Sequence, residues 1–60
     1  MKTQTLHYAG YTIKITYDQV EDNYTYVIAD KEGKELKLGG PFEDNNDAFA
    51  SACMEINEEL

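Results

Sequence analysis

Two stretches of the chain alternate between apolar and polar residues, and this period of two is typical of strands with one buried face. They span residues 11–17 and 24–29, and both are rich in the β-branched and aromatic residues that strands favour. The side chains expected to face the core are Tyr11, Ile13, Ile15, Tyr17, Tyr24, Tyr26 and Ile28. We therefore predict two half-buried strands in these ranges.

A shorter strand is expected on each side of this pair. Residues 5–8 precede Ala9 and Gly10, which form a two-residue turn in which the glycine is free to adopt a positive φ. Residues 35–38 follow a polar turn, and we expect this strand to stop at the glycines and the proline of residues 39–41. Loops this short imply antiparallel pairing of successive strands.

Residues 45–58 change to the period of about 3.6 that is typical of an amphipathic helix. Asp44 is a good N-cap, and the carboxylate of Asp47 favours the positive end of the helix dipole. The apolar stripe expected to face the sheet comprises Phe49, Ala52, Cys53, Ile56 and Leu60.

These elements predict an α+β fold, an antiparallel three- to four-stranded meander with one C-terminal helix packed on one face. With 60 residues, the chain is expected to form a single domain, residues 1–60, near the lower size limit for independent folding. Cys53 is the only cysteine, so no internal disulfide can stabilise the fold. We therefore expect either a monomer or a homodimer in which association supplies part of the stability.

Five lysines, no arginine and twelve acids give the chain a formal net charge of −7. Proteins that bind nucleic acid through its phosphates need a basic surface, so this charge predicts no direct contact with DNA or RNA. No apolar segment approaches the roughly 18 residues of a membrane span, and the first residues lack the apolar stretch of a signal peptide. One unpaired cysteine favours a reducing compartment, and we expect the cytoplasm.

Few residues of this chain are suited to catalysis or metal binding. His7 is expected at the solvent side of an edge strand, and Cys53 in the core, where burial makes a thiol a poor nucleophile. The acidic segments 30–35 and 43–47 lack the spacing of a calcium loop, and a turn and a helix cap explain them. We therefore predict no catalytic residue, no metal site and no cofactor, and a protein that is not an enzyme.

The helical segment carries the clearest sign of a binding surface. Residues 43–60 contain six acids and no basic residue, so all five lysines lie in the sheet half of the chain. Such an asymmetric charge can steer a partner and select its sign. The predicted protein-binding residues on the outer face of the helix are Asp44, Asp47, Met54, Glu55 and Glu58. They would suit a basic protein partner, and the alternative that the acids serve only solubility stays open.

The order of three strands and a helix resembles two related families. One is the C-terminal half of double-stranded-RNA-binding domains, and the other is the HicB-like antitoxins, which look like a truncated form of that fold. The likeness covers most of the chain from Tyr11 onward and implies the same packing of a helix on a meander. The residues that carry the resemblance are Gly39, Gly40, Ala48, Ala52 and Leu60.

The sequence departs from the RNA-binding family where that family's lysines grip phosphates, at the start of the helix. The corresponding residues here are Asn45, Asn46 and Phe49, with Asp47 among them, so the resemblance does not carry RNA binding over. The segment from Tyr8 to Ile13 is also similar to short uncharacterised bacterial and phage proteins.

Three functions are therefore compared. The first is a small acidic, non-enzymatic protein-binding module that acts as an adaptor, an antitoxin-like protein or an inhibitor. The second is an acidic mimic of nucleic acid, of phage origin, that blocks a DNA- or RNA-handling protein. The third is a nucleic-acid-binding domain of the double-stranded-RNA-binding type, which the net charge disfavours.

Overall fold

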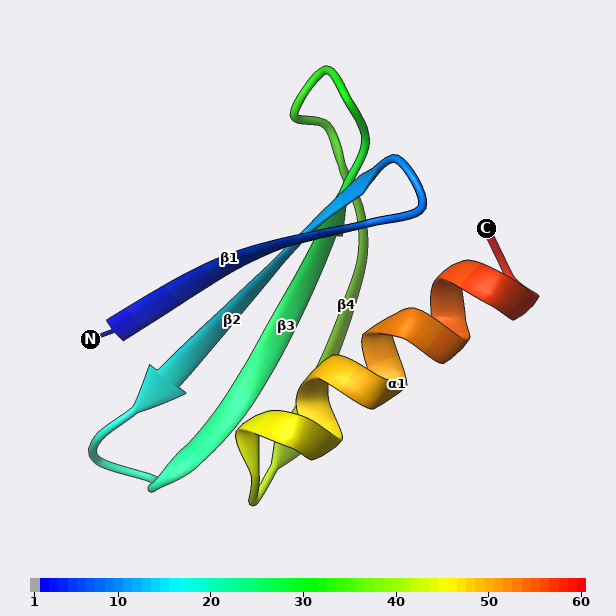
Figure 1. Cartoon of the computed structure of the whole chain (residues 1–60). Helices are drawn as coiled ribbons and strands as arrows, with labels where there is room; N and C mark the ends of the chain where they lie inside the picture. Colours follow the sequence, from blue (N-terminus) through cyan, green and yellow to red (C-terminus); the bar gives the residue numbers. More distant parts are fainter. Residues whose placement is uncertain (1) are drawn as a thin grey trace.

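The computed structural model describes residues 2–60 and contains one antiparallel sheet and one helix. Its elements in chain order are β1 (Lys2–Tyr8), β2 (Tyr11–Asp18), β3 (Asn23–Ala29), β4 (Glu35–Phe42) and α1 (Asn45–Glu58). The strands lie in the sheet in the order β1-β2-β3-β4, and α1 crosses one face of the sheet (Figure 1). The structure thus confirms the predicted α+β class, with four strands in the meander.

The two outer strands are longer than the sequence predicts. β1 begins at Lys2, and its first residues pair with the end of β2, where Thr3 lies opposite Thr16. β4 continues to Phe42, so the prediction that it stops at residues 39–41 was wrong. Proline has no backbone N–H to donate to a neighbouring strand. β4 tolerates Pro41 because it is an edge strand with a neighbour on one side only.

Gly39 serves close packing within β4 and does not end the strand. The ring of Tyr26 lies directly against the backbone at this position, and a Cβ there would overlap the ring. The β3–β4 register also shifts between Tyr24 and Tyr26, so β4 pairs irregularly along this part of its length.

The turn between β1 and β2 has the geometry that a right-twisted hairpin needs. Ala9 and Gly10 have φ values of 52° and 86°, which is the double positive φ of a type I′ turn. The turn before β4 is held by Asp30, whose Oδ1 accepts the N–H groups of Glu32 and Lys34, each at 2.9 Å. Both turns are set by short local interactions.

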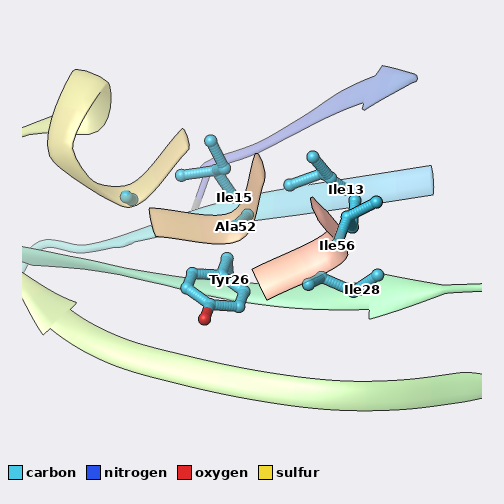
Figure 2. Close-up of a cluster of buried hydrophobic side chains, with 7 residues drawn as sticks. Ile13, Ile15, Tyr26, Ile28, Ala52 and Ile56 are labelled. Atoms are coloured by element: carbon cyan, nitrogen blue, oxygen red, sulfur yellow. The ribbon is translucent and has the colours of Figure 1, made fainter. Parts of the chain in front are cut away.

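The core lies between α1 and the middle strands of the sheet (Figure 2). Ile13 and Ile28 have no exposed surface, and Tyr26 keeps 7%. Tyr17 lies on the predicted side of β2, opposite Tyr24, but beyond the edge of the buried cluster, where its hydroxyl donates to Asp22 Oδ1 at 2.6 Å. The buried residues of the cluster are Ile13, Ile15, Tyr26, Ile28, Ala48, Ala52 and Ile56.

The helix meets the sheet through a stripe that is rotated from the predicted one. Its buried residues are Ala48, Ala52 and Ile56. Phe49 is only partly buried at the margin of the core, and Leu60, which is 43% exposed, lies beyond the end of the helix. Two alanines facing the sheet allow the helix backbone to approach closely, so the isoleucines and Tyr26 of the sheet fill the space between the layers.

The uncovered face of the sheet is rich in threonine. Thr3, Thr16 and Thr25 are register partners across three strands, and Thr3 Oγ1 lies 3.2 Å from Thr16 Oγ1. The alternation of the strands places all the threonines of the chain on this face, and they are Thr3, Thr5, Thr12, Thr16 and Thr25. One face of the sheet is therefore apolar under the helix, and the other is hydroxyl-rich and open.

Candidate protein-binding surface

The outer face of α1 presents an acid–methionine–acid row. Asp47, Met54 and Glu58 are exposed, and Met54 keeps 59% of its surface open to solvent. At 1.5 Å per residue, Asp47 and Glu58 lie about 10 Å and about 6 Å along the helix axis from Met54, on either side of it. The helix period places these three residues opposite the buried stripe. We call them the outer row.

Glu55 was predicted to share this face, but the structure places it on the flank of the helix beside β4. Its carboxylate Oε1 lies 2.9 Å from Lys37 Nζ, and the two side chains are 22% and 47% exposed. Hydrogen bonding to Glu55 raises the pKa of Lys37. Glu55 is therefore engaged in an ion pair within the molecule and is less accessible to a partner than the outer row.

Asp44 has a structural role at the start of the helix. Its Oδ1 accepts the backbone N–H of Asn46 at 2.8 Å, which satisfies one of the donors that a helix N-terminus leaves free. This confirms the predicted N-cap. The residue is exposed, so its carboxylate adds to the negative charge at the end of the helix that precedes Asp47.

The acids of the helical segment are largely uncompensated. Within residues 2–60, the ion pair between Lys37 and Glu55 is the only salt bridge. The last helical turn contains no basic residue, although Glu58 and Glu59 lie there at the negative end of the helix dipole. The outer row therefore lies on a helix whose acids outnumber the one cation that pairs with them, Lys37.

The single histidine and the single cysteine of the chain lie on different elements, β1 and α1. His7 is exposed on β1 and faces the uncovered side of the sheet, where its Nδ1 lies 3.5 Å from Thr12 Oγ1. Cys53 is a free, partly buried thiol beside the core under α1, and burial raises its pKa. Across residues 2–60, no three histidine, cysteine or acidic side chains are placed so that they could hold one metal ion.

A hollow of about 520 Å³ lies beside the start of the helix and was not foreseen from the sequence. Ile15 is its one aliphatic wall, Lys2 its one charged residue, and Tyr17 and Tyr24 pack at 5.0 Å between ring centres. Asn45 crosses its edge and donates through Nδ2 to Gln4 Oε1 at 3.0 Å. Residues from three strands and the helix form this hollow, so no local sequence pattern marks it.

None of the helical segments in residues 2–60 combines the length and the apolar character that crossing a membrane requires. Comparisons with family models, with curated proteins and with solved structures give no match for the chain. The resemblance to double-stranded-RNA-binding domains and to HicB-like antitoxins therefore stays a prediction.

Proposed function

We propose that the chain is a non-enzymatic protein-binding module whose contact surface is the outer row of α1. The observation that carries this proposal is the exposed Met54 between Asp47 and Glu58, in a segment with no basic residue. Methionine is flexible and polarisable, and it is enriched at protein interfaces. A partner of matching chemistry would present a small apolar depression bordered by lysine or arginine.

The position of Met54 separates this proposal from mimicry of nucleic acid. A mimic needs negative groups at the spacing of phosphates, and helix positions four residues apart, about 6 Å along the axis, are spaced on that scale. However, the group that occupies the centre of the row is an uncharged thioether, where a mimic would need an anion. Mimicry is the second candidate, and direct binding of nucleic acid is disfavoured by the negative net charge.

The test is affinity capture of partners on the immobilised chain, with identification of the captured proteins by mass spectrometry. Reversing both acids of the outer row, Asp47→Lys with Glu58→Lys, should abolish capture of a basic partner. The matched control reverses two exposed loop acids, Glu21→Lys with Glu32→Lys, which changes the net charge equally. Capture that is lost in the first variant and kept in the control supports the outer row.

Quantitative binding to the captured protein then tests the apolar part of the surface. Met54→Ala should weaken binding at any ionic strength, because it removes an apolar contact. The double reversal should instead slow association and reduce its dependence on salt. If all charge variants weaken binding equally, net charge alone is responsible and the outer row is not a specific site.

Competition distinguishes the mimic. A nucleic-acid mimic must displace duplex DNA or RNA from the captured protein, whereas a module that binds elsewhere leaves that complex intact. The chain itself should give no gel shift with duplex DNA or RNA at micromolar concentration, and a shift that weakens with rising salt would contradict this expectation.

A further inference from the structure

The two edges of the sheet differ in how well they are protected from pairing with another strand. An exposed edge strand presents free backbone N–H and C=O groups, and proteins block such edges with proline, bulges or inward-pointing charges. β4 has all three of these features: Pro41 lies within it, its register with β3 shifts twice, and Lys37 turns onto the helix side to meet Glu55. This edge is unsuited to strand addition.

β1 has no proline and no bulge, and its one charge on the helix side, Lys2, lies at the very start of the strand. Its seven residues, Lys2–Tyr8, pair with β2 in an unbroken register and include no proline, glycine or acid. α1 packs on β2, β3 and β4, and reaches β1 through side-chain hydrogen bonds at Gln4 and Tyr8. The outer backbone of β1 is therefore left uncovered (Figure 1).

The hairpin geometry shows which backbone groups are free. In a two-residue hairpin, the residues that flank the turn form a hydrogen-bonded pair, and such pairs then alternate along the ladder. Tyr8 and Tyr11 flank the turn, so the even-numbered residues of β1 bond to β2. The odd-numbered residues, Thr3, Thr5 and His7, direct their N–H and C=O groups outward.

We propose that β1 pairs with β1 of a second copy of this chain, antiparallel about a twofold axis at Thr5. In this register Thr5 faces Thr5 of the second copy, and Thr3 faces His7 of the second copy. By the twofold symmetry, His7 also faces Thr3 of the second copy. These three pairs are of the hydrogen-bonded type, so about six backbone hydrogen bonds satisfy the outward groups of both strands. Two four-stranded sheets would then join into one continuous sheet.

The charges along β1 favour a second copy over other occupants. Two chains of net charge −7 repel each other, and β1 is the edge strand without a carboxylate. The same register places Lys2 opposite Tyr8 of the second copy. The hydroxyl of Tyr8 accepts from Asn57 Nδ2 at 3.0 Å, next to Glu58 at the uncompensated end of α1. Each Lys2 would therefore approach the most acidic part of the other chain.

The size of the interface sets the expected strength. A standard stable interface buries about 800 Å² on each partner, which is near a fifth of the 4235 Å² surface of this chain. A single pair of seven-residue strands covers less than that, so the dimer should be weak and in exchange with monomer. We expect association at about 0.1–1 mM chain and dissociation on dilution to a few micromolar.

Sedimentation velocity of the full chain across this concentration range is the direct test, with a change from 6.8 kDa to twice that mass. Thr5→Pro should give monomer at all concentrations, because proline removes an outward N–H that β2 does not use. Thr5→Val keeps the donor and the shape and should dimerise like the parent. A parent that stays monomeric at about 1 mM, or a folded Thr5→Pro that dimerises normally, overturns the proposal.

Two further measurements keep the test decisive if Thr5→Pro fails to fold. Thr5→Lys brings two like charges together at the twofold axis and should weaken the dimer at least tenfold, whereas Thr25→Lys on the interior strand β3 should not. In the parent, the amides of Thr3, Thr5 and His7 should exchange with solvent more slowly at about 1 mM than at low concentration. Unchanged exchange at these three amides, together with a concentration-dependent mass, would assign the contact to another surface and overturn the proposal.

Discussion

The fourteen residues of α1 form two faces with different roles. The inner face presents two alanines and Ile56 to the sheet, and close packing there stabilises the domain. The outer face presents Asp47, Met54 and Glu58, which contribute little to that packing because they are exposed. Mutations on the inner face therefore report on folding, whereas those on the outer face can report on binding without disturbing the fold.

The largest contrast is expected between Ile56→Ala and Met54→Ala, two truncations only two positions apart. Ile56 is 5% exposed, so its loss leaves a cavity and should lower the free energy of unfolding by about 2–5 kcal/mol. Met54 is 59% exposed and its truncation should change stability by less than about 0.5 kcal/mol. Urea denaturation of the two variants measures both, and equal losses would contradict the assignment of the two faces.

The next effect concerns the sheet surface that the inner face contacts. Gly39→Ala should cost about 1–3 kcal/mol, because the added Cβ overlaps the ring of Tyr26 and forces it to move under the helix. In a Tyr26→Leu background the overlapping ring atoms are absent, so the same substitution should cost less. Chemical denaturation of the four proteins in this double-mutant cycle gives the coupling. Additive losses would mean that the ring is not the cause.

A smaller effect tests whether the two acids at the start of the helix differ in their roles. Asp44→Ala removes the cap that accepts the Asn46 N–H and should cost about 1 kcal/mol. Asp47→Ala removes an exposed acid of the outer row and should stay within about 0.5 kcal/mol. In thermal unfolding followed by circular dichroism, the Tm of Asp44→Ala should therefore be lower than those of Asp47→Ala and the parent.

The last expected effect is a loss of stability that begins only at alkaline pH. The pKa of Tyr26 is raised above its ordinary 10.0 by burial and then by Glu55, and that of Lys37 is raised above 10.5 by its bond to Glu55. Groups whose pKa is raised on folding stabilise the protein fully below their ordinary pKa, and this stabilisation is lost as the pH rises through the raised value. The free energy of unfolding should thus fall above about pH 10.

Tyrosinate absorbance during a pH titration measures the raised pKa values of the tyrosines, on which this prediction depends. Tyr17, whose pKa is raised by its hydrogen bond to Asp22, and Tyr26 should both ionise above pH 10.0. Tyr26→Phe should remove one of these late ionisations, and Asp22→Asn should shift the other toward its ordinary value. Simultaneous ionisation of all tyrosines at pH 10 while the fold is intact would contradict the expectation.

Local patterns predict the centre of the fold because the relevant forces act over a few residues. Alternation identified β2 and β3, and the cap at Asp44 together with the helical period identified α1 from Asn45 to Glu58. The ends of the outer strands were missed for a physical reason. Lys2 to Gln4 has no apolar residue to mark a buried side, and the tolerance of β4 for Pro41 depends on its place at the edge.

The sequence likewise predicted part of the candidate surface, and the part it missed depends on the sheet. The 100° rotation per residue places Asp47, Met54 and Glu58 on the outer side without knowledge of the sheet. The pairing of Glu55 with Lys37 depends on the β3–β4 register, which shifts twice and cannot be deduced from either strand alone. The rotation of the buried stripe toward Ala48 likewise depends on the isoleucines and the Tyr26 ring that the sheet presents.

The strand order β1-β2-β3-β4 also has a consequence for the speed of folding. Every strand pairs with its neighbour in the chain, so each hairpin can close over a short loop at low entropic cost. The contacts that join residues far apart in sequence are mainly those that α1 makes with the sheet, and Tyr8 and Asn57 are 49 positions apart. The local pairing of the strands predicts a folding time in the millisecond range or below. We expect the three hairpins to form and dissolve repeatedly until the helix docks on the sheet and stabilises them.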